Sequence, residues 1–214
     1  MTVALKYCGL TRPEDAAVAG ELGAAYVGVI FAGGPRMLSA AFARQVLDAA
    51  GAGVLRVGVF GAQPPEDLAR AADEARLDIV QLHADPTPDD VATARAATSC
   101  EVWGAVRISA REPAPDWRSL SGAADGVVLD AKVAGALGGT GASFDWPAAA
   151  VSVASQRSSL LILAGGLNAA NVARAVGALS PDVVDVSSGV EASTGVKDHG
   201  RMRAFADAAR GGGR

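Results

Sequence analysis

The chain has 214 residues, of which 50% are hydrophobic and 5% aromatic, and a formal net charge of −4. This composition supports a self-sufficient core of Ala, Val, Leu and Ile, and it excludes a basic surface for nucleic acid or for an anionic membrane. Its two cysteines, Cys8 and Cys100, make neither a disulfide framework nor a zinc motif. With no signal-peptide pattern and no apolar run of the roughly 18 residues that a membrane span needs, we expect a cytoplasmic protein.

Apolar segments typical of buried strands alternate with Ala-rich helical segments along the whole chain. The apolar runs predict strands over residues 3–8, 25–31, 54–60, 78–84, 102–108, 126–131, 160–165 and 183–189. Helical periodicity is clearest over residues 13–22, 41–50, 65–75 and 169–179. In the segment 109–125, two prolines leave room for only a short helix.

Strands that are apolar throughout, each followed by a helix, indicate a parallel sheet covered on both faces. About eight such units favour a single (β/α)₈ TIM barrel of the α/β class over a doubly wound open sheet, which usually has five or six strands. No internal linker interrupts the pattern. We therefore expect one domain over residues 1–210, followed by a disordered Gly-rich tail over residues 211–214.

Ionisable side chains stand at the ends of two strands that should face each other across such a barrel. Cys8 ends the first predicted strand and Asp130 lies near the end of the sixth. In barrel enzymes the C-terminal strand ends form the active-site rim, so a thiol and a carboxyl pointing inward could act as general base and general acid. The alternatives are a small buried cysteine at a turn and a capping or surface carboxylate, which the apolar run before Asp130 disfavours. Lys6 shares the face of Cys8 and should favour its thiolate.

Two turns predict a phosphate site, because barrel enzymes hold phosphoryl groups with backbone N–H groups after the seventh and eighth strands. The turn residues are Gly165, Gly166, Ser187, Ser188 and Gly189. The GGTG run at 138–141 lacks the GxGxxG pattern and does not open a helix after a strand, so we predict no dinucleotide site. The expected partner is a small phosphosugar.

Three further side chains fall on the predicted rim. Arg36 follows a Gly-Gly-Pro turn, where its guanidinium could bind a carboxylate or could simply be solvated. His83 ends the fourth strand, where it would bind the substrate or make a structural hydrogen bond. Asp185 and Lys6 should both point inward from adjacent strands, which would allow an ion pair that orients a substrate hydroxyl or only neutralises itself.

At this point the sequence resembles the phosphoribosylanthranilate isomerase family of tryptophan biosynthesis. The resemblance rests on KYCGLTRPEDA (6–16), GVIFAGGPRMLS (28–39), VGVF (57–60), VQLHA (80–84), VVLDAKVAGALGGTGASFDW (127–146), LLILAGGLNAANV (160–172) and VVDVSSGVEASTGVKD (183–198). These segments span nearly the whole chain in order. The chain departs from the family pattern at Tyr7, at Ala84 and in the Gly33-Gly34 loop.

The resemblance implies a barrel that catalyses an Amadori rearrangement with no cofactor and no metal. N-(5-phosphoribosyl)anthranilate would become 1-(2-carboxyphenylamino)-1-deoxyribulose 5-phosphate. Asp130 matches the general acid that opens the ribose ring, and Cys8 matches the general base that removes the C2′ proton. Arg36 matches a residue near the anthranilate carboxylate, and Asp185 a ribose-hydroxyl contact. The glycine and serine turns match the phosphate site.

Two other functions fit part of the pattern. A metal-dependent phosphosugar epimerase lacks its His and carboxylate ligand set here, and a non-catalytic phosphosugar-binding barrel would not need the acid and base. Barrels that isomerise the related histidine-pathway aminoimidazole use two carboxylates, which Cys8 argues against. The sequence leaves monomer and homodimer as alternatives.

Overall fold

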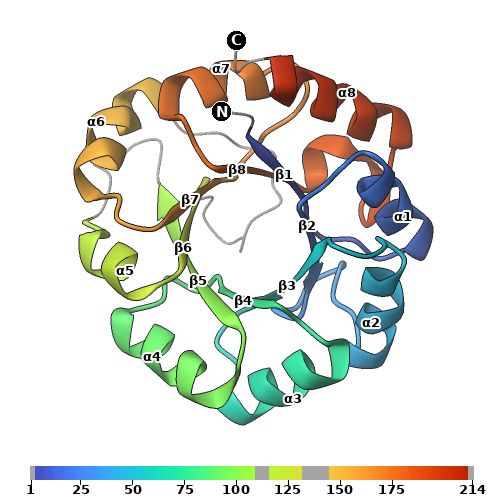
Figure 1. Ribbon diagram of the computed structural model, residues 1–214, viewed down its shortest axis with the longest axis vertical. Helices are drawn as coiled ribbons and strands as arrows, with labels where there is room; N and C mark the ends of the chain where they lie inside the picture. Colours follow the sequence, from blue (N-terminus) through green and yellow to red (C-terminus); the bar gives the residue numbers. More distant parts are fainter. Residues whose placement is uncertain (1–2, 109–115, 132–144, 212–214) are drawn as a thin grey trace.

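Eight parallel strands close into a barrel in the computed structural model, which describes residues 3–108, 116–131 and 145–211 (Figure 1). The strands follow one another around the ring in chain order, and β1 closes it by pairing with β8. Their bounds are β1 Ala4–Tyr7, β2 Tyr26–Ile30, β3 Leu55–Phe60, β4 Ile79–Leu82, β5 Glu101–Ile108, β6 Gly126–Ala131, β7 Leu160–Leu163 and β8 Val183–Val186. The sequence prediction of a (β/α)₈ barrel is confirmed.

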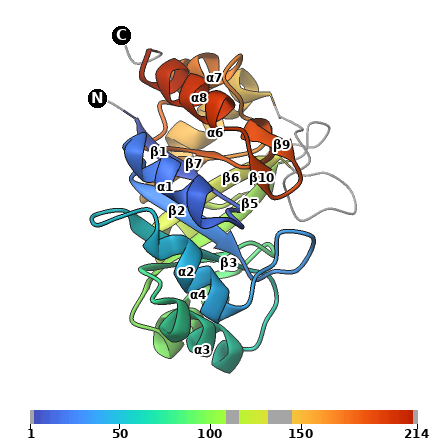
Figure 2. The same ribbon diagram turned by 90° about the vertical axis from the view of Figure 1, so that its right-hand side faces the viewer.

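Helices form the outer layer and connect the strands, as the side view shows for α1 to α4 (Figure 2). They are α1 Pro13–Glu21, α2 Ala40–Asp48, α3 Pro65–Ala75, α4 Pro88–Ala97, α5 Arg118–Ala123, α6 Trp146–Gln156, α7 Val172–Leu179 and α8 His199–Gly211. Proline begins α1, α3 and α4, where its fixed φ suits the first helical turn and its missing N–H costs nothing. The short α5 confirms the expectation for the proline-containing unit.

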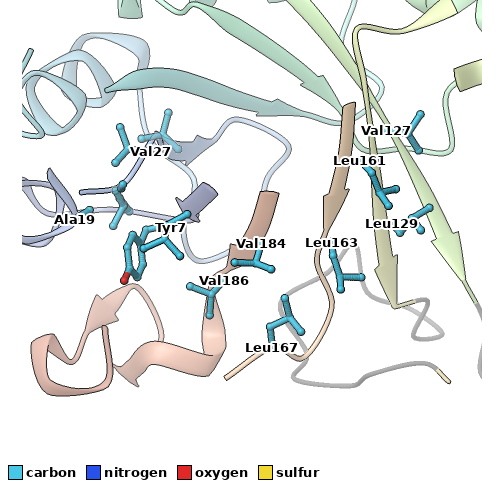
Figure 3. Close-up of a cluster of buried hydrophobic side chains, with 14 of the residues drawn as sticks. Tyr7, Ala19, Val27, Val127, Leu129, Leu161, Leu163, Leu167, Val184 and Val186 are labelled. Atoms are coloured by element: carbon cyan, nitrogen blue, oxygen red, sulfur yellow. The ribbon is translucent and has the colours of Figure 1, made fainter. Parts of the chain in front are cut away.

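Side-chain alternation along the strands divides the core into two layers. Outward-facing aliphatic residues of the strands share one buried cluster with residues of the helices; Figure 3 shows four of them, Leu161 and Leu163 on β7 and Val184 and Val186 on β8. Inward-facing residues fill the barrel with a second, smaller cluster that includes Trp103. The interior is therefore a packed core, and the polar inward-facing residues lie nearer the C-terminal ends of the strands.

Tyr7, one of the departures from the family pattern, belongs to the outer layer. Its ring meets Phe205 of α8 edge to face, and its hydroxyl donates to the carbonyl of Met202 at 2.8 Å. Burial raises the pKa of this phenol, so it stays protonated and keeps donating. Tyr7 therefore packs α8 against β1. Because side chains alternate along a strand, it points away from the barrel interior, on the face opposite to Lys6.

One feature of the fold was not predicted. After β8 the chain forms a short 3₁₀ helix, η1 Ser188–Val190, and then a two-stranded hairpin of β9 Glu191–Ser193 and β10 Val196–Lys197. Residues 109–115 of the proline-containing segment and the GGTG run at 138–141 lie outside the described residues. Of the expected tail, Gly211 ends α8 and residues 212–214 lie outside the described residues.

Candidate active site

A cavity of about 430 Å³ opens among the C-terminal strand ends, and every site residue predicted from the sequence lines it. Those residues are Cys8, Arg36, His83, Asp130, Gly165, Gly166, Asp185, Ser187, Ser188 and Gly189. They come from loops and strands spread around the ring, so the barrel closure is what brings them together. Their chemical roles are considered below.

Cys8 follows β1 directly and is buried beside Lys6. Gly28 on the neighbouring strand leaves room for it, because a Cβ at that position would lie 3.0 Å from Cys8 Sγ. Burial raises the pKa of the thiol, and the nearby charges of Lys6 and Lys197 oppose this without overcoming it. The expectation that Lys6 favours the thiolate is therefore right in direction, but burial outweighs it.

Asp130 is buried near the end of β6, with both carboxylate oxygens beside donors. The backbone N–H of Ala131 donates to Oδ1 at 2.8 Å, and His83 Nε2 lies 3.2 Å from Oδ2. Asp130 stands in register with Arg107 on β5. Each carboxylate oxygen has two lone pairs, so one on each oxygen remains for a proton or a substrate.

The turns after β7 and β8 form a cradle that only glycine permits at its closest points. A Cβ on Gly189 would lie 1.9 Å from the carbonyl oxygen of Leu167, so any side chain there would collide with the facing turn. Gly165 and Gly166 adopt positive φ angles of 84° and 65°, which favour glycine. Ser187 Oγ is buried, with no hydrogen-bond partner among the described residues. A buried hydroxyl, together with glycine backbone that no side chain covers, is suited to bind an oxyanion in the cavity.

Arg36 is held by an ion pair that the sequence did not reveal. Its Nε and Nη2 donate to the two carboxylate oxygens of Glu191 at 2.7 and 2.6 Å, and the side chain is only 13% exposed. Lys197 Nζ donates to the same carboxylate at 3.0 Å and to the Ser187 carbonyl at 3.1 Å. Burial alone would raise the pKa of Glu191, but the two cations lower it overall. Arg36 is therefore not a solvated surface arginine.

The predicted ion pair inside the barrel is present. Lys6 and Asp185 are register partners on β1 and β8, and Lys6 Nζ lies 2.6 Å from Asp185 Oδ2. Asp185 Oδ1 is buried and has no partner among the described residues, so it is available to a substrate hydroxyl. Lys6 also donates to Gln81 Oε1 at 3.1 Å.

Three residues of the site were missed from the sequence. Gln81 lines the cavity, and its position two residues before His83 could have placed it on the inner face of β4. Glu191 and Lys197 belong to the unpredicted hairpin. Within the described ranges, no helix is long and apolar enough to cross a membrane, and no group of three or more His, Cys, Asp or Glu side chains is placed to hold a metal ion.

Comparison with known proteins assigns the chain to one family along almost its whole length. The model of the N-(5′-phosphoribosyl)anthranilate isomerase family matches residues 5–208. The isomerase of that name from Pseudomonas fluorescens strain Pf0-1 is 40% identical over 211 residues, which cover 96% of this chain and 97% of the relative.

Solved structures agree with this assignment. The phosphoribosyl anthranilate isomerase of Thermus thermophilus superposes with a TM-score of 0.84 at 35% identity, covering 96% of this chain and 98% of that one. A second isomerase structure, in complex with reduced 1-(o-carboxyphenylamino)-1-deoxyribulose 5-phosphate, gives 0.80 at 32% identity and covers 98% and 99%. The chain therefore belongs to the N-(5′-phosphoribosyl)anthranilate isomerase family.

Proposed function

We propose that this protein converts N-(5-phosphoribosyl)anthranilate to 1-(2-carboxyphenylamino)-1-deoxyribulose 5-phosphate, with Asp130 as general acid and Cys8 as general base. The observation that carries the proposal is that one cavity contains a buried thiol, a buried carboxyl and the cradle of the two glycine turns. The related isomerase bound to the reduced product analogue supports the choice of substrate.

The reaction needs one proton donor and one proton acceptor. Asp130 gives its proton to the ribose ring oxygen as the bond from that oxygen to C1′ breaks, and the nitrogen lone pair forms a protonated Schiff base at C1′. The Cys8 thiolate then removes the C2′ proton, and the electrons move to give an enolamine. Protonation at C1′ and loss of the hydroxyl proton at C2′ yield the ketone.

The remaining lining residues match the other functional groups of this substrate. The phosphate occupies the cradle formed by the turns after β7 and β8, where Ser187 Oγ donates to it. Arg36 binds the anthranilate carboxylate with Nη1, the guanidinium nitrogen that Glu191 does not engage. Asp185 Oδ1 accepts from a ribose hydroxyl.

The assembly and cellular location form a separate part of the proposal. A related isomerase from Thermotoga maritima is dimeric, and monomers have been generated from it. We infer that this chain works in the cytoplasm as a monomer or a homodimer. Light scattering on the purified protein distinguishes the two states.

The proposal is tested by following the anthranilate fluorescence of freshly prepared substrate with the purified protein. The wild type turns the substrate over, and the rate is insensitive to chelators. Asp130→Asn keeps the shape of the side chain but has no acidic proton, so kcat falls by about 10²–10⁴. A wild type with no turnover, or an Asp130→Asn variant as fast as the wild type, contradicts the assignment.

A further inference from the structure

A row of polar contacts, made of two hydrogen bonds and one ion-pair contact, crosses the barrel interior and ends at the proposed acid. Lys6 Nζ donates to Gln81 Oε1 at 3.1 Å, Gln81 Nε2 lies 3.2 Å from His83 Nδ1, and His83 Nε2 lies 3.2 Å from Asp130 Oδ2. It starts on β1, passes through β4 on the opposite side of the ring and reaches β6 (Figure 1). All four side chains are buried, and three of them, Gln81, His83 and Asp130, also line the cavity.

The direction of each bond follows from the chemistry of Lys6. An ammonium group has only donors, so the Gln81 atom that faces it is the carbonyl oxygen. Burial alone would lower the pKa of Lys6, but Asp185 and Cys8 raise it overall, which keeps the ammonium charged. The Gln81 amide nitrogen therefore faces His83, and since an amide nitrogen only donates, Nδ1 of His83 must accept.

A histidine whose Nδ1 accepts is neutral and carries its proton on Nε2, the nitrogen beside Asp130. We propose that Lys6 and Gln81 hold His83 in this tautomer, as a fixed N–H donor to the Asp130 carboxyl and a positioning residue for the acid. The proposal refines the substrate-contact role that the sequence predicts for His83, and it rests on the proposed function of Asp130.

The arrangement has a use in the first step of the reaction. When Asp130 gives its proton to the ring oxygen, negative charge develops on its carboxylate. In this tautomer the protonated His83 Nε2 lies 3.2 Å from one carboxylate oxygen, and the Ala131 N–H donates to the other, so both can stabilise that charge with little movement. Among the described residues, Arg107 on β5 and Asp185 on β8 also interact electrostatically with Asp130. Because Nε2 already carries a proton, His83 cannot take the proton of Asp130, which stays available for the substrate.

Nuclear magnetic resonance can test the tautomer without any assay of activity, because His83 and His199 are the only histidines of the chain. Long-range ¹H–¹⁵N spectra of ¹⁵N-histidine-labelled protein distinguish the two neutral tautomers from the imidazolium, and His199→Asn assigns the signals. We expect the wild-type His83 to be neutral with its proton on Nε2. The other tautomer, or an imidazolium, in the wild type overturns the proposal.

Variants of Gln81 test whether its amide sets the tautomer of His83, because they reverse or remove the hydrogen bond to Nδ1. In Gln81→Glu the carboxylate accepts from both Lys6 and His83, so Nδ1 must become a donor and the His83 signals must change. Gln81→Met removes the donor to Nδ1 and leaves only the contact with Asp130 to select the tautomer. The His199 signal reports the fold, since this residue bonds Asp15 on α1, outside the barrel. An unchanged His83 spectrum in Gln81→Glu overturns the proposal.

The link to catalysis is tested with a matched pair at position 83. His83→Gln can still present an N–H to Asp130 and should keep most of kcat, whereas His83→Leu should lower kcat on the order of 10²-fold with a smaller change in KM. If the two variants are equally active although the wild type has the expected tautomer, His83 does not position Asp130 for catalysis, and the proposal fails. If Asp130→Asn is also fully active, the proposed function itself fails.

Discussion

Replacing Glu191 gives the strictest test of the electrostatics of the site, because its carboxylate is paired with two cationic side chains. Its carboxylate accepts two bonds from Arg36 and one from Lys197, whose side chain is fully buried. Glu191→Gln keeps the shape but removes the charge and turns one acceptor into an NH₂ donor that faces a cation. The only other acceptor of Lys197 among the described residues is then the Ser187 carbonyl.

The size of the effect follows from leaving a buried charge without its partner. Removing one member of a buried ion pair costs about 3–5 kcal/mol. For a chain of this size each kcal/mol lowers the melting temperature by about 2–4 °C, so we expect a fall of about 6–20 °C by differential scanning calorimetry. Arg36 also loses its orientation, and KM for the substrate rises more than kcat falls.

Two controls complete the test. Glu14→Gln removes an exposed partner of Arg12 and should leave the melting temperature nearly unchanged. Lys197→Met combined with Glu191→Gln removes the stranded cation, so the double variant should be less destabilised than the sum of the two single variants. Two results would refute this account of the Arg36–Glu191–Lys197 cluster. One is a Glu191→Gln variant that melts within 2 °C of the wild type. The other is a double variant whose loss of stability equals the sum of the losses of the two single variants.

Two further predictions concern the cradle and the thiol. Inorganic phosphate should inhibit competitively and stabilise the fold by about 2.7 kcal/mol at a hundredfold excess over Kd. Gly189→Ala should abolish both effects, because its Cβ would collide with the Leu167 carbonyl oxygen. The control Gly177→Ala, whose Cβ would enter open space, should keep both effects. Noncompetitive inhibition would place the phosphate elsewhere. In a Cys100→Ser background, the rate at which iodoacetamide modifies Cys8 should keep rising with pH from pH 7 to 9, because burial raises the pKa of the thiol and the thiolate fraction grows with pH. A rate already constant at pH 7.5 contradicts this.

The barrel and the composition of the cavity could be predicted because both depend on local patterns. Alternation along β1 places Lys6 and Cys8 on one face from the sequence alone, and the same rule puts Asp130 at the end of an inward-facing row. Once eight strands close in order, the strand ends must converge. That is why the predicted site residues line one cavity.

The partners of these residues could not be predicted, because they depend on contacts between distant segments. Glu191 is 155 positions from Arg36, and its place is set by η1 and the hairpin, which carry no strong periodicity. The state of Cys8 depends on the balance between burial and two cations, which only the packed barrel decides. Tyr7 departs from the family pattern on the outer face of β1, and it contacts α8 rather than the cavity.

The identity of the general base is the central claim, and one variant tests it most directly. Cys8→Ser exchanges sulfur for oxygen with little change in shape, but a hydroxyl has a far higher pKa and is a poor base. In the anthranilate fluorescence assay we expect kcat to fall by at least about 10²-fold, while the product analogue still binds and Cys100→Ser keeps full activity. Turnover by Cys8→Ser within about threefold of the wild type would contradict the claim and leave Cys8 as a buried side chain at a turn.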